Sequence, residues 1–219
     1  MVEMHLLSVN VDFSYDPIYG LGVVSSFNRF MEGYQPERDK ESIFEAICRS
    51  VGHEPDNYRQ DANLAQVVSQ SLSGKELLSW FSTPTPLEGT GELDKTVKKI
   101  AENPKFKYSR LFAIGIYTLL ESAYPEAVKD EKQLNEILKQ ISDALNIPEY
   151  KLQKDLELYR SNLEKMVQAQ NMMQDAIQAE RKKREKLTQE RNQATTSTEV
   201  SQEASTQESD TPKDEAQSS

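Results

Sequence analysis

The sequence predicts an all-α protein, namely a multi-helix bundle with a long C-terminal coiled-coil-like helix and a disordered acidic tail. Apolar residues recur at steps of three and four, the period of an amphipathic helix, and no window alternates like a strand. After Pro148 these steps settle into a seven-residue repeat. We therefore expect a bundle domain at residues 1–147, an amphipathic helix at 148–190 and a disordered tail at 191–219.

The stretch from Tyr108 to Tyr124 is the predicted centre of the bundle. Between its charged ends, Arg110 and Glu121, the run is apolar on every face of a helix, which is typical of a helix enclosed by protein or lipid. A membrane span needs roughly 20 apolar residues, so the run is too short for lipid. Gly115 lies in its middle, where we expect another helix to pack closely.

The helices before this stretch are predicted from their caps and spacing. A helix end at residues 2–11 runs straight off the first residue. The pair Asp16-Pro17 starts a helix that should end near Gly33, because Asp caps backbone N–H groups and Pro suits the first helical position. Further helices are expected around residues 43–51, from Pro55, after the capping box Ser73-Gly74-Lys75-Glu76, and at 93–100.

After the central stretch, Pro125 starts one predicted helix that extends to Leu145. Pro148 starts a longer one, whose repeat positions are Leu152, Leu156, Tyr159, Leu163, Met166, Gln170, Met173 and Ile177. Such a stripe needs a partner. The partner is a helix of another protein, the same helix of a second copy in a weak self-association, or the chain's own bundle. From Asn192 the chain is rich in Ser, Thr, Gln and Glu, a composition that predicts disorder.

Composition limits the classes of partner and compartment. The 219 residues carry a formal charge of −10, which argues against nucleic acid, since nucleic acid attracts Lys and Arg. Cys48 is the only cysteine, so a reducing compartment is expected. The first residues resemble neither a signal peptide nor a transit peptide. We expect a protein of a bacterial cytoplasm, or a processed or truncated form.

No catalytic constellation is evident, and we expect no enzyme, cofactor or metal site. The two histidines, His5 and His53, lie on separate segments, and Cys48 with His53 offers too few ligands for zinc. Cys48 lies on an apolar helical face, where a buried, unreactive thiol is expected. Gly20-Leu21-Gly22 lacks the preceding strand of a dinucleotide fingerprint.

Two basic clusters are candidate docking sites for anionic lipid or an acidic partner. The first comprises Lys95, Lys98, Lys99, Lys105, Lys107 and Arg110, and a solvated helix face is its expected role. The second is Arg181, Lys182, Lys183 and Arg184 in the run RKKREK. Together with the repeat positions Leu156, Tyr159, Leu163, Met166, Met173 and Ile177, this second cluster forms our set of candidate interaction residues.

Three separated stretches resemble the thylakoid formation protein family, also described as photosystem II biogenesis factors of cyanobacteria and chloroplasts. They are MHLLSVN at the start, FNRFMEGYQPERDKESIFEAICRSVGHEPDNYRQDA at 27–62 and FKYSRLFAIGIYTLLE at 106–121. The likeness extends from residue 1 to about residue 190 in the same order. Family members carry further residues before the first stretch, so a truncated or misassigned start is expected here.

The resemblance implies an all-helical, non-enzymatic protein that is peripheral to photosynthetic membranes, on the cytoplasmic side of the thylakoid membrane in cyanobacteria. It implies a role in thylakoid biogenesis and in photosystem II assembly and repair. It also implies membrane-bound FtsH-type proteases and photosystem II assembly components as partners. A scaffold or oligomerisation protein at the membrane surface, without a protease role, is the alternative.

Overall fold

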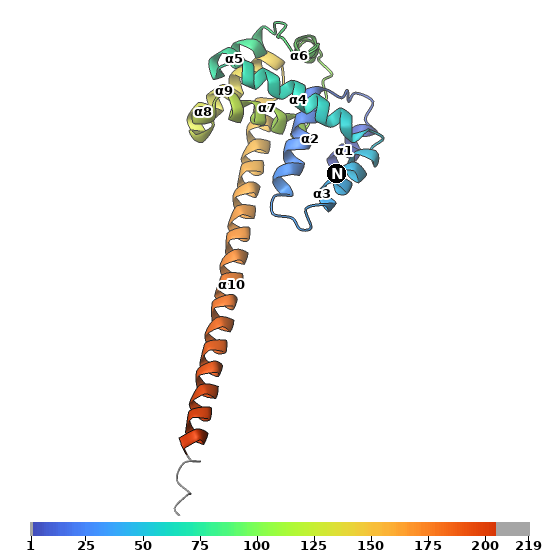
Figure 1. The fold of residues 1–219 in the computed structure, drawn as a ribbon. Coiled ribbons are helices and arrows are strands. Elements are labelled where there is room, and N and C mark those ends of the chain that lie inside the picture. The colour runs from blue at the N-terminus through green and yellow to red at the C-terminus, as the bar shows by residue number, and fades with distance from the viewer. Residues whose placement is uncertain (1, 205–219) are drawn as a thin grey trace, which may run out of the picture. The chain divides into compact units, whose positions relative to one another are not determined.

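A computed structural model of the chain describes residues 2–204, with side chains through residue 189 (Figure 1). It divides into two compact units, one ending at Met166 and one beginning at Val167, a division that lies inside the last helix. Within the described residues the helices are α1 (Val2–Ser8), α2 (Pro17–Phe30), α3 (Asp39–Arg49), α4 (Pro55–Ser71), α5 (Gly74–Ser82), α6 (Leu93–Ala101), α7 (Arg110–Ala123), α8 (Pro125–Lys129), α9 (Glu131–Leu145) and α10 (Glu149–Ala204).

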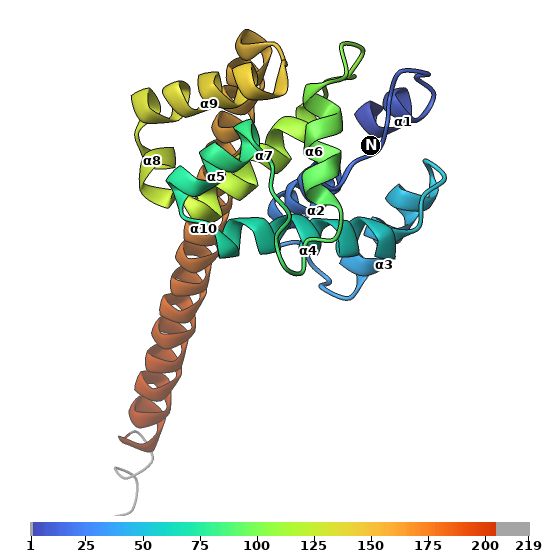
Figure 2. The same ribbon diagram turned by 90° about the horizontal axis from the view of Figure 1, so that it is seen from above.

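The first unit is built on α7, as the sequence predicts. Helix α7 packs most extensively against α2, and α2 also packs along α4. Helix α9 lies beside α5 and α8 (Figure 2). The middle of α7 is fully enclosed, with Ile114, Ile116 and Leu119 all buried.

Two glycines allow α2 and α7 to touch backbone to backbone. A Cβ atom on Gly22 would overlap the carbonyl group of Leu111 and lie 2.9 Å from the backbone nitrogen of Gly115. A Cβ atom on Gly115 would overlap the carbonyl of Ile18 in the same way. The close approach expected at Gly115 is therefore confirmed, and α2 is the helix that makes it.

The predicted helix starts are confirmed by their hydrogen bonds. The Asp16 carboxylate accepts a hydrogen bond from the Tyr19 N–H at 2.9 Å, and Pro17 follows as the first residue of α2. The Ser73 N–H donates to the Glu76 carboxylate at 2.8 Å at the start of α5. Such caps satisfy N–H groups that the first turn of a helix leaves without a partner.

One predicted helix is two. The segment from Pro125 to Leu145 was expected to be continuous, but it breaks at Asp130 into α8 and α9. The Asp130 carboxylate accepts hydrogen bonds from the N–H groups of Lys132 and Gln133, at 2.9 and 3.1 Å, and caps a new helix. An Asp followed by good helix formers is a start signal that competes with continuation.

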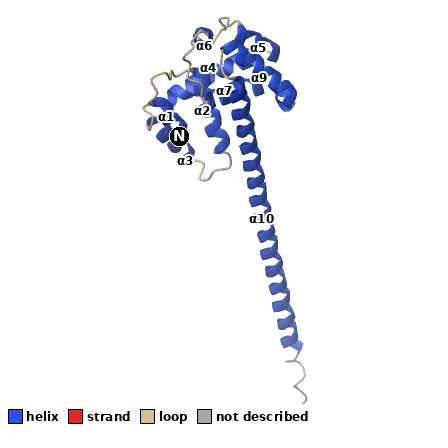
Figure 3. Ribbon diagram, turned by 180° about the vertical axis from the view of Figure 1, so that it is seen from behind, coloured by secondary structure: helices blue, strands red, loops and turns tan. Residues whose placement is uncertain are grey.

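Two helix ends also differ from expectation. Helix α2 stops at Phe30 and does not continue to Gly33. Helix α10 continues to Ala204, past the expected start of the tail at residue 191, since neither Gly nor Pro occurs between Pro148 and Pro212 to end it. The rest of the predicted tail, 205–219, lies outside the described residues. No strand occurs at residues 2–204 (Figure 3), so the predicted all-α class is confirmed.

Asp16 is a buried carboxylate, and burial disfavours its ionised form. The pKa of Asp16 is raised to about 7. Loss of hydration is the main cause and the charge of Asp61 adds to it, while the N–H groups of Tyr19 and Ile18 lower the pKa. The ionised form is thus less favourable in the folded protein than in the unfolded chain. Since the folded pKa is the higher one, this group destabilises the fold increasingly as pH rises from about 4 to about 7.

We expect Gly115→Ala to lower the free energy of unfolding by about 3 kcal/mol or more, the upper range for overpacking, because backbone cannot move aside as a side chain can. Gly20→Ala is the matched control on α2, since its methyl group would meet only the tip of Tyr15, 2.6 Å from the hydroxyl oxygen. Urea unfolding of both variants measures the difference. Equal stability of the two would show that the α2–α7 contact tolerates a side chain.

We expect Asp16→Asn to stabilise the protein relative to wild type at pH 8 more than at pH 4.5. Asparagine keeps the cap but carries no charge, so it removes the penalty that appears between about pH 4 and 7. Urea unfolding at both pH values gives the comparison, with Asp12→Asn as the exposed control. A pH-independent difference between Asp16→Asn and wild type would mean that Asp16 titrates as it does in the unfolded chain.

Candidate interaction surfaces

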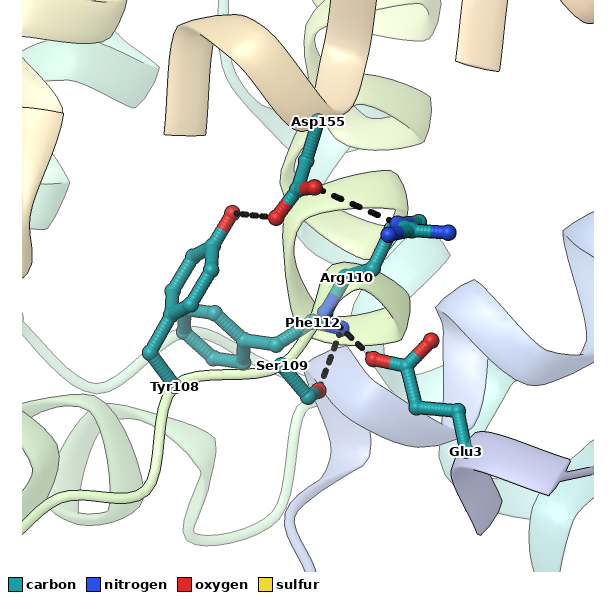
Figure 4. Close-up of polar contacts among 6 residues, drawn as sticks. All are labelled: Glu3, Tyr108, Ser109, Arg110, Phe112 and Asp155. Carbon is teal, nitrogen blue, oxygen red and sulfur yellow. Dashed lines mark hydrogen bonds and ion pairs between the residues drawn. The ribbon is translucent and has the colours of Figure 1, made fainter. Parts of the chain in front are cut away.

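A polar junction joins the start of α10 to α7 and α1 (Figure 4). The Tyr108 hydroxyl donates to one carboxylate oxygen of Asp155 at 3.0 Å, and the Arg110 Nε–H donates to the other at 3.2 Å. The Arg110 backbone N–H donates to the Glu3 carboxylate at 2.7 Å. Burial and the neighbouring Asp155 raise the pKa of Tyr108, so its hydroxyl keeps its proton and remains a donor. The junction fixes the first turns of α10.

Three of the six cations in the first basic cluster are paired with acidic neighbours. Lys95 lies 2.5 Å from Glu92, Lys98 lies 4.0 Å from Glu102, and Arg110 belongs to the junction with Asp155. Phe106, between these cations in sequence, packs its ring against Phe112 in the bundle, with 5.0 Å between ring centroids. The structure therefore favours the solvated-face interpretation over a docking site.

The candidate interaction residues on α10 fall into two groups. Leu156 and Tyr159 are 1% and 3% exposed and belong to the core of the bundle. Leu163 is half-buried against that core, and Met166 is half-buried too. The expectation that Leu156 and Tyr159 face a partner is not met, because the chain's own bundle covers this part of the stripe and its apolar side chains are already out of water.

The apolar repeat positions of the second unit are exposed. Met173 and Ile177 are 65% and 64% exposed, and Leu187, which continues the same repeat, is 56% exposed. Isolated apolar residues at a surface are ordinary, but these recur along one helix over several turns. A coiled coil through them remains a prediction.

The second basic cluster is partly neutralised within α10. The Arg181 Nε–H donates to Glu185 at 3.0 Å, and a guanidinium N–H of Arg184 donates to Glu180 at 2.6 Å. Lys182 and Lys183 are exposed and form no ion pair with another residue that the structure describes. Of the four cations in this cluster, Lys182 and Lys183 are therefore the two that are open to an anionic surface.

Catalytic and metal chemistry finds little support in the described part of the chain. There, no group of three or more His, Cys, Asp or Glu side chains is arranged to hold a metal ion. Burial raises the pKa of the Cys48 thiol to about 11, which disfavours the reactive thiolate. His53 is stacked on Tyr15, with 5.6 Å between ring centroids. Among the helices described, none is long and apolar enough to cross a bilayer.

Several polar residues of the bundle were not identified by sequence reasoning. Arg29 on α2 pairs with Glu121 on α7 through two hydrogen bonds, and Asp155 connects α10 to α7. The partners are 92 and 45 residues apart, and single charges on amphipathic helices carry no signal of long-range pairing. Arg160, a half-buried cation on α10, was also missed, because the apolar repeat does not show which polar positions the bundle covers.

The chain is similar in sequence and in structure to known proteins. Protein Thf1 of Trichormus variabilis is 60% identical over 177 residues, which is 81% of this chain and 76% of that protein. Protein Thf1 of Nostoc punctiforme is 56% identical over 177 residues, with 81% and 75% covered. The solved structure of Psb29 has a TM-score of 0.68 and 38% identity, covering 84% of each chain. The model of the thylakoid formation protein family matches residues 1–188, and the chain belongs to that family.

Proposed function

We propose that this protein is a non-enzymatic auxiliary factor in thylakoid membrane biogenesis and in photosystem II assembly and repair. It acts by binding a membrane-bound FtsH-type protease, and photosystem II assembly components with it, at the cytoplasmic side of the thylakoid membrane. Membership of the thylakoid formation protein family supports the process. The protease partner rests on the resemblance of the sequence to that family.

The observation that carries the binding mechanism is the change along α10 from buried to exposed repeat positions. The stripe that packs into the bundle at Leu156 and Tyr159 continues to Met173 and Ile177, which are exposed. An apolar helical stripe of this period suits a second helix, because knobs from one chain fill holes in the other. The preferred partner is therefore a helix of another protein.

Self-association through the same stripe is the alternative, and would make the protein a structural scaffold at the membrane surface. Methionines at positions 166 and 173 and a glutamine at position 170 dilute the seam. A dimer through this stripe would be weak for that reason, since flexible or polar side chains specify a helical interface poorly. A binding role without catalysis is also consistent with the buried Cys48 thiol.

We expect Met173→Lys with Ile177→Lys to abolish co-purification with the membrane protease, because two charges would have to be buried in the helical interface. Tagged protein isolated from solubilised thylakoids and analysed by mass spectrometry measures this. Both side chains are exposed, so the bundle should keep its circular dichroism and melting temperature.

The control is Met172→Lys with Ala179→Lys, which places two lysines on exposed positions roughly 120–140° away from the seam around the same helix. Binding retained by the control and lost by the seam variant supports the proposal. Retention by both variants would place the partner surface elsewhere. The scaffold alternative would be favoured if the wild type recovered no protease but formed a concentration-dependent dimer in sedimentation, and the seam variant did not form that dimer.

We expect Lys182→Gln with Lys183→Gln to weaken sedimentation with anionic vesicles, since each cation near such a surface contributes about 1 kcal/mol. Arg181→Gln with Arg184→Gln should have a smaller effect, because both arginines are paired with glutamates on α10. The measurement compares vesicles with and without anionic lipid at low salt. Equal sedimentation of the wild type with both kinds would remove the cluster from membrane attachment.

A further inference from the structure

A cavity of about 370 Å³ opens between α2, α7, α8 and the part of α10 that belongs to the first unit. Its size lies within the roughly 300–1,000 Å³ range of small-molecule sites. The proposed function leaves it unused.

The charged side chains of the cavity leave one cation without a partner. Arg29 is bonded to Glu121, and Lys129 is bonded to Glu126 at 2.8 Å. Arg160 lies half-buried in the wall and makes no hydrogen bond or ion pair with the residues the structure describes. It also borders a smaller cavity of about 130 Å³, lined by Glu131 and Glu157, without pairing with either.

The charge of Arg160 acts inside the cavity. Burial raises the pKa of the Tyr117 hydroxyl to about 12, and the charge of Arg160 opposes that rise. Arg29 and Lys129 are each bonded to a carboxylate, so Arg160 is the cation of the lining whose N–H donors are left for a ligand. A single negative charge on the ligand would pair with it.

The remaining wall is apolar. Tyr117 is buried and meets Tyr159 edge to face, with 6.1 Å between ring centroids. Val128 is buried, Leu163 is half-buried against the core, and Pro125 completes this side. A ligand that fills the cavity therefore has an apolar body beside its charged group, since pockets bind by apolar contact and orient ligands through a few polar groups.

We propose that this cavity binds a small monocarboxylate with an aliphatic body. Its carboxylate pairs with the Arg160 guanidinium, which offers a planar fork of N–H donors that matches two oxygens. Its chain lies against Val128, Leu163 and the Tyr117 ring. The Arg29–Glu121 pair stays intact, because it already satisfies both of its members.

The test uses octanoate as the probe and calorimetric titration of the full chain. We expect octanoate to bind, and acetate and octanol to bind at least roughly tenfold more weakly, since each lacks one half of the recognised chemistry. Arg160→Gln should weaken octanoate binding roughly tenfold or more and leave the melting temperature unchanged, because no protein partner is lost.

Arg181→Gln is the matched control, since Arg181 is an exposed arginine of the same helix outside the cavity, and it should bind octanoate like the wild type. Leu163→Gln should weaken octanoate more than acetate. Undetectable octanoate binding at millimolar concentration, equal affinity for octanol, or unchanged affinity in Arg160→Gln would each overturn the proposal. All three outcomes are independent of protease binding, so they leave the proposed function untouched.

Discussion

Backbone contact between α2 and α7 is the constraint on which the rest of the bundle depends. Gly22 and Gly115 each face a carbonyl of the opposite helix, so neither position has room for a side chain. Because α2 also packs along α4, and α7 contacts α4, α5 and α8, the crossing sets the spacing of most of the bundle. A protein interior is close-packed, so a displacement at this crossing would be transmitted to every layer around it.

Helix α10 belongs to both units of the chain, and its two parts differ in how much they contribute to the stability of the bundle. Leu152, Leu156 and Tyr159 are core residues, and Asp155 is held by Tyr108 and Arg110. The first turns of the helix are therefore part of the bundle. Beyond Met166 the apolar side chains of the stripe are exposed, and substitutions of these residues test binding without testing the fold.

Charge is distributed unevenly over an acidic chain. Several cations among the described side chains are paired with carboxylates three or four residues away in the chain, as Arg49 is with Glu45 and Arg181 with Glu185. Such exposed pairs contribute little to stability. Among the cations without an ion pair, Lys182 and Lys183 lie on the exposed part of α10 and Arg160 lies beside the cavity, so these three are better placed to contact another molecule than to stabilise this one.

The sequence by itself determined the helical class, the central position of α7 and the caps at Asp16 and Ser73, because helical period and capping are local properties that neighbouring residues specify. It also indicated that Gly115 meets another helix. Only the tertiary structure decided which helix that is, that Leu156 and Tyr159 are core, and that Arg29 meets Glu121. An apolar stripe predicts that a helix face is buried but does not predict which helix covers it. A single charged residue likewise does not predict a counterion 92 residues away. Packing makes both choices, since it depends on how helices far apart in the chain fill one shared volume.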